Sequence, residues 1–120
     1  MKPDNDSQIH KIRSLRKEAQ DFFIKRSEVY RAFLRMEELT FRDGALSKKE
    51  KELIAIGISV AVNCESCLEW HINQAFRSGA TDAEILEAVE VGIEMSGGPG
   101  TVASRFAMKV MKSLPEIKTK

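Results

Sequence analysis

The sequence predicts one all-α domain of about six helices. Apolar residues recur at spacings of three and four along the chain, and no segment alternates as a strand would. Capping motifs and glycines divide this pattern into segments of ordinary helix length. A chain of 120 residues is long enough to form a hydrophobic core without disulfide staples. We expect a polar leader at residues 1–6, the domain at 7–114 and a frayed tail at 115–120.

The first two predicted helices precede Gly44, and each has an apolar stripe. The spacing within each stripe places its residues on one helix face. The first stripe comprises Ile9, Ile12, Leu15, Ala19, Phe22 and Phe23, and the second comprises Val29, Tyr30, Phe33, Met36 and Phe41.

The third and fourth predicted helices meet at Asn63. A capping box from Ser47 to Glu50 predicts the start of the third helix, which is apolar nearly all round and therefore expected to be central. Asn63 is expected to break the chain and to cap the fourth helix, at residues 64–78. The fourth helix would direct Cys64, Cys67, Leu68, His71, Ile72 and Ala75 inward, and Glu69, Asn73, Gln74 and Arg77 outward.

The fifth and sixth predicted helices are separated by a glycine-rich stretch at residues 97–100. A second capping box, from Thr81 to Glu84, opens the fifth helix, and the sixth is expected at residues 101–113. The expected inward positions are Ile85, Leu86, Val89 and Ile93 in the fifth helix, and Val102, Phe106 and Val110 in the sixth.

Composition argues against several classes of function. The 19 basic and 18 acidic residues nearly balance, and no basic tract exceeds two residues, so nucleic acid and membrane surfaces are not expected partners. The longest apolar run, at residues 53–62, is too short to cross a bilayer, and the polar N-terminus does not resemble a signal peptide. We therefore expect a cytoplasmic location, where a CxxC pair is more often catalytic or metal-binding than a structural bridge.

Cys64, Cys67 and His71 form the most informative functional pattern. Two thiols three residues apart can close a disulfide with each other, and helical spacing places His71 one turn beyond Cys67 on the same face. Thiol redox chemistry needs these groups: two sulfurs that exchange electrons and a base that produces a thiolate. A helix N-terminus favours the thiolate, whereas burial opposes it. The competing interpretation is that the cysteines are small buried hydrophobes and the histidine a core residue.

Glu52 is a candidate for orienting His71. If the third and fourth helices form an antiparallel hairpin about Asn63, the two residues differ in height by roughly 4–5 Å at 1.5 Å per residue. A carboxylate at that position would orient the imidazole and raise its basicity. The surrounding lysines and glutamates also suit a solvated first turn, so the spacing alone leaves both interpretations open.

Several longer stretches of the sequence, taken together, resemble a known family. They are residues 44–47 with 51–55, residues 63–71, residues 79–81 with 84–88, and residues 97–99. Together they resemble the alkyl hydroperoxidase D / carboxymuconolactone decarboxylase family over residues from about 33 to 111. The resemblance implies the helical alkyl hydroperoxidase D-like fold for the domain at 7–114. It also implies assembly as a homo-oligomer, commonly a trimer or hexamer.

The resemblance also assigns roles to the candidate residues. The family pattern places a glutamate twelve residues before a CxxC pair and a histidine four residues after it, which corresponds here to Glu52, Cys64, Cys67 and His71. It implies a cofactor-free, peroxiredoxin-type antioxidant enzyme, a peroxidase or disulfide oxidoreductase, with a hydroperoxide or disulfide substrate and a thiol reductant. The peroxidase branch has a relay histidine where this chain has Ser66. The resemblance favours Cys67 as the attacking thiol, whereas the helix dipole favours Cys64.

Two other classes of function remain open from the sequence. Cys64, Cys67, His71 and Glu52 are chemically acceptable zinc ligands, which would make the chain a metal-binding helical module. A cofactor-free lyase of the carboxymuconolactone decarboxylase type, acting on small carboxylates, would need His71 but not the cysteines.

Overall fold

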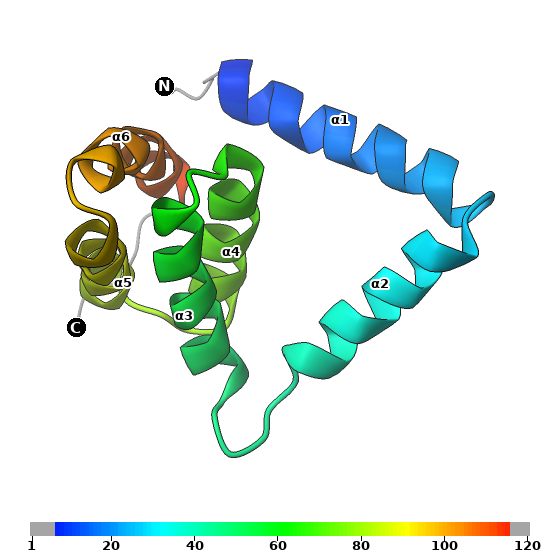
Figure 1. Cartoon of the computed structure of the whole chain (residues 1–120), viewed down its shortest axis with the longest axis horizontal. Helices are drawn as coiled ribbons and strands as arrows, with labels where there is room; N and C mark the ends of the chain where they lie inside the picture. The colour runs from blue at the N-terminus through cyan, green and yellow to red at the C-terminus, as the bar shows by residue number, and fades with distance from the viewer. Residues whose placement is uncertain (1–6, 116–120) are drawn as a thin grey trace.

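A computed structural model describes residues 7–115 and shows six helices and no strand there (Figure 1). The helices are α1 (Ser7–Ile24), α2 (Glu28–Thr40), α3 (Lys48–Ala61), α4 (Glu65–Arg77), α5 (Asp82–Ser96) and α6 (Gly98–Ser113). The prediction of an all-α fold is confirmed. The leader expected at 1–6 and most of the expected tail, at 116–120, lie outside the described residues.

Helices α3 to α6 form a bundle in which α3 is central, as its apolar sequence predicts. Helix α3 packs against α4, α5 and α6, and both predicted capping boxes are present, at the starts of α3 and α5. The core of this bundle is formed by buried aliphatic side chains and one phenylalanine, among them Ile56, Val60, Leu68, Ile72, Ile85, Phe106 and Val110. Within residues 7–115, no helix combines the length and apolarity needed to cross a membrane.

Helices α1 and α2 form an arm that projects from this bundle (Figure 1). Helix α1 contacts α4 and α2, and Ile9 is its buried residue. Helix α2 has no buried residue, and its apolar stripe is open: Val29 is 80% exposed, and Phe33 and Met36 are 54% exposed. The stripes thus predicted the helices, but the second stripe packs on no core within the described chain.

Three details of the last two helices differ from the prediction. Leu86 and Val102 were expected to point inward, but they are 46% and 51% exposed. Helix α6 begins at Gly98 rather than residue 101, because Pro99 needs no hydrogen-bond partner for its nitrogen in a first helical turn. Gly97 precedes this helix with a φ of 72°, a conformation that glycine adopts readily.

Candidate functional site

The two cysteines lie at the start of α4 and form a disulfide. Asn63 takes a φ of 56° and turns the chain out of α3, so Cys64, with an extended backbone, is the N-cap that Asn63 was expected to be. The Sγ atom of Cys64 accepts a hydrogen bond from the backbone N–H of Cys67 at 3.2 Å. Both cysteines are half-buried. A thiolate at Cys64 would therefore sit where a helix supplies an unpaired N–H group and the positive end of its dipole.

His71 and Glu52 are in direct contact across α4 and α3. The Nδ1 atom of His71 lies 2.7 Å from Oε1 of Glu52, and the Nζ atom of Lys48 lies 2.7 Å from the other carboxylate oxygen. Glu52 is only 1% exposed, although its helix begins with a run of charged residues. The sequence left its placement open, and the structure places it in the interior beside His71.

The charge state of Glu52 determines which nitrogen of His71 is free. Burial by itself would raise the pKa of the Glu52 carboxyl, but the hydrogen bonds and charges of His71 and Lys48 outweigh burial and hold this pKa below its ordinary value. An ionised carboxylate has no proton to donate, so Nδ1 of His71 carries the hydrogen of their bond. In a neutral imidazole the Nε2 atom then keeps the lone pair and can act as a base. The ring also stacks on Phe41, with centroids 5.2 Å apart.

Of the four predicted residues, Cys64 and Cys67 thus lie at the start of α4. His71 and Glu52 meet where α4 packs against α3. Cys67 and His71 are four residues apart in the same helix and lie on one face. A pocket of about 350 Å³ opens beside Glu52. It is lined by Leu34, Glu37, Glu38, Phe41 and Arg42 from α2 and the segment after it, and by Lys48, Glu52, Trp70 and Gln74.

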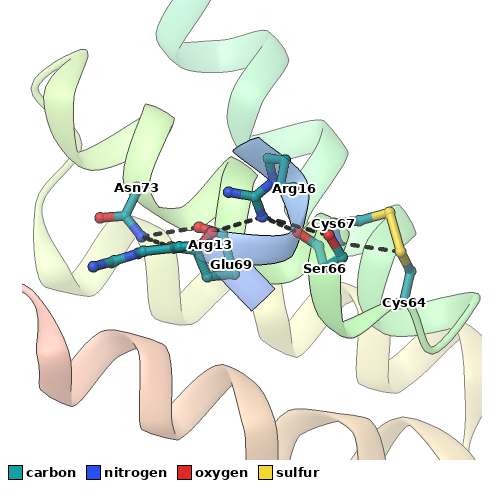
Figure 2. Close-up of polar contacts among 7 residues, drawn as sticks. All are labelled: Arg13, Arg16, Cys64, Ser66, Cys67, Glu69 and Asn73. Atoms are coloured by element: carbon teal, nitrogen blue, oxygen red, sulfur yellow. Dashed lines mark hydrogen bonds and ion pairs between the residues drawn. A yellow bond between two sulfur atoms is a disulfide. The ribbon is translucent and has the colours of Figure 1, made fainter. Parts of the chain in front are cut away.

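Glu69 was expected to point outward, and that prediction is wrong. Its side chain is 2% exposed and binds Nε of Arg13 at 2.5 Å and Nη2 of Arg16 at 2.7 Å, both from α1 (Figure 2). Asn73 also donates to its carboxylate at 3.1 Å. The sequence held one signal for this cluster: Arg13 and Arg16 are three residues apart, so they share one face of their helix. The structure packs that helix, α1, against α4.

The zinc interpretation finds no support in this geometry. Among residues 7–115, no three histidine, cysteine, aspartate or glutamate side chains converge so that they could hold a metal ion. The donors considered as ligands are instead engaged in the disulfide and in the contact between His71 and Glu52.

Solved structures share this fold. A carboxymuconolactone decarboxylase family protein of Legionella pneumophila is 28% identical, with a TM-score of 0.82 over 91% of this chain and all of that one. A Thermotoga maritima protein of the same family is 24% identical, with a TM-score of 0.78 over 85% of this chain and 87% of that one. Its name gives that protein a possible part in an antioxidative response. At this identity, the likeness shows the fold alone.

Sequence comparison identifies the family. An uncharacterized protein of the cox locus of Paracoccus denitrificans is 37% identical over 83 residues, which cover 69% of this chain and 75% of that protein. An uncharacterized protein of Cupriavidus necator is 35% identical over 69% of this chain and 74% of its own length. The family profile matches residues 27–110, which include the cysteine pair, His71 and Glu52. The chain therefore belongs to the carboxymuconolactone decarboxylase family.

Proposed function

We propose that the protein is a thiol–disulfide oxidoreductase that reduces hydroperoxides through Cys64 and Cys67. The observation that carries this proposal is the disulfide at the start of α4, with His71 one helical turn beyond it and held by the buried Glu52. A cofactor-free lyase would use His71 but would leave the paired cysteines without a role.

The proposed cycle balances with two electrons. One thiolate attacks the peroxide oxygen, which breaks the O–O bond, releases an alcohol and leaves a sulfenic acid on the cysteine. The second thiol attacks that sulfur, which forms the disulfide and releases water. His71 takes the thiol proton and returns it to the leaving oxygen, and Glu52 fixes the ring orientation. A small thiol or dithiol protein then reduces the disulfide and is itself oxidised.

Thiol counting tests the proposal directly. Free thiols per chain are expected to fall from two to none when the reduced protein meets one equivalent of hydroperoxide, and to return with a dithiol. Cys64→Ser and Cys67→Ser should each fail to form the internal disulfide. The variant that still consumes peroxide identifies the attacking cysteine. Wild-type protein that keeps both thiols would show that peroxide is not the substrate.

We also propose that the chain forms a homo-oligomer. An apolar groove of about 570 Å³ lies between α3 and α5, lined by residues such as Ile54, Ile58, Val91 and Met95. These four side chains are each more than half exposed, as is Val29 on the unpartnered face of α2. Apolar surface of this extent is typical of protein–protein interfaces. The trimer or hexamer implied by the family resemblance would cover it.

Gel filtration measures this second property. The protein is expected to elute well above the mass of one 13.5 kDa chain. Ile58→Glu, which places a charge in the groove, should shift the protein to smaller species, whereas Lys112→Glu on α6 should not. Elution of the wild type as a monomer would contradict the proposal.

A further inference from the structure

Arg16 contacts the peptide group that lies between the two cysteines. Its Nη2 atom is 3.1 Å from the carbonyl oxygen of Ser66 and 3.4 Å from the Ser66 hydroxyl. The N–H of the same peptide group belongs to Cys67 and donates to Sγ of Cys64. The guanidinium and the sulfur therefore sit at opposite ends of one peptide group (Figure 2).

A buried carboxylate holds Arg16 in this position. Glu69 binds its Nη2 atom at 2.7 Å, and the guanidinium lies 5.2 Å from the centre of the Trp70 ring. The Arg16 side chain is 25% exposed, so water screens it only in part. Arg13 of the same helix also pairs with Glu69, but it makes no hydrogen bond to the Ser66–Cys67 peptide group.

We propose that Arg16 is a positioning residue that stabilises the thiolate of Cys64 through the Ser66–Cys67 peptide group. A cation on a carbonyl oxygen polarises the peptide and makes its N–H a stronger donor. A donor directed at a thiolate favours the charged sulfur over the neutral thiol. Arg16 thus favours the reduced pair and makes Cys64 the better leaving group when the disulfide is opened.

The inference rests on the redox role proposed above and concerns its reductive half. A thiolate of the reductant attacks Sγ of Cys67, the S–S bond breaks, and Cys64 leaves as the stabilised thiolate. The second thiolate of a dithiol then attacks the mixed disulfide, which frees Cys67 and oxidises the reductant. Electrons pass from two reductant sulfurs to two protein sulfurs.

Equilibration with reduced and oxidised dithiothreitol tests the proposal. Arg16→Gln is expected to lower the equilibrium constant for reduction about tenfold, which is about 30 mV for this two-electron couple. Arg13→Gln is the matched control, because Arg13 also pairs with Glu69 from α1 but has no hydrogen bond to Ser66. Its equilibrium constant should stay near that of the wild type. Equal shifts in both variants would overturn the proposal in favour of a packing role for α1.

The pH dependence of alkylation supplies a second readout. In a Cys67→Ser background, Arg16→Gln should raise the midpoint pH of Cys64 alkylation by about one unit, the counterpart of a tenfold change in acidity. Arg16→Lys should recover part of this shift, and Arg13→Gln should not move it. An unchanged midpoint in Arg16→Gln would refute the inference. These measurements use no peroxide, so they stand if peroxide is not the substrate, whereas a pair that never exchanges with dithiol would overturn both proposals.

Discussion

Replacing Glu52 with glutamine is expected to slow peroxide-dependent disulfide formation by about a hundredfold or more, the range usual for loss of acid–base catalysis. Glutamine keeps the shape but offers an N–H as well as an oxygen to Nδ1 of His71. The ring then no longer has a fixed tautomer, and Nε2 is a base for only part of the time. Stopped-flow measurement of thiol loss against pH gives the rate and its profile.

Two comparisons make this result specific. Glu50→Gln changes the same charge in the same helix, but Glu50 is exposed and serves the capping box, so its rate should remain close to the wild type. His71→Ala should slow the reaction as much as Glu52→Gln does. If the two residues act as one unit, the double variant should be no slower than His71→Ala alone. Fully additive losses would contradict the proposed pairing.

Glu52→Gln should also change how the stability of the protein depends on pH. Because contacts with His71 and Lys48 hold the pKa of Glu52 below its usual value despite burial, the ionised carboxylate stabilises the folded state. This contribution is present above the ordinary carboxyl pKa of about 4.3 and is lost as pH falls through the lowered folded-state value. In denaturant unfolding at neutral pH, the free energy of unfolding of the wild type should exceed that of Glu52→Gln by about 1–3 kcal/mol. The difference should shrink below about pH 4.

The helices could be predicted from the sequence because their signals are local. Both capping boxes formed where Ser47 and Thr81 indicated. At Asn63 the local signal was incomplete: it marked the break correctly, but a residue with φ of 56° cannot be the extended N-cap, and that position passed to Cys64. The one-residue difference matters because it places a sulfur, rather than an amide oxygen, at the first free N–H groups of α4.

Partners from distant segments could not be predicted in the same way. The position of Glu69 in the sequence of α4 suits a solvent-exposed side chain. Helix α1 buries this side chain, and the arginines of α1 precede it by more than fifty residues. Its contact with Arg16 links the arm to the cysteine pair, and no periodicity within α4 encodes it. The exposure of Leu86 and Val102 has the same origin, because an apolar stripe shows which face avoids water but not which surface covers it.

Gly92→Ala is expected to destabilise the protein by about 2 kcal/mol, since overpacking in a closely packed core costs about 1–3 kcal/mol. Gly92 is where α5 crosses α3. A Cβ atom added there would lie 2.6 Å from the carbonyl oxygen of Gly57 and 2.7 Å from Cβ of Val60. Neither atom is the end of a flexible side chain, so the helices would have to move apart. Thermal unfolding at a fixed protein concentration should show the loss as a lower midpoint.

Gly44→Ala is the matched control, because a Cβ added at Gly44 meets only the end of the Lys51 side chain, at an ordinary contact distance of 3.7 Å. Replacing a glycine whose φ is not positive with alanine reduces the conformational entropy of the unfolded chain, so the midpoint of this variant should stay or rise. The contrast also bears on the site. Helix α3 holds Glu52 against His71 while α5 supports it from the other side, so separating α3 from α5 should loosen the pair. Gly92→Ala is therefore expected to slow peroxide-dependent disulfide formation as well as to lower the midpoint, and a full rate with a lowered midpoint would show that the Glu52–His71 contact does not depend on this packing.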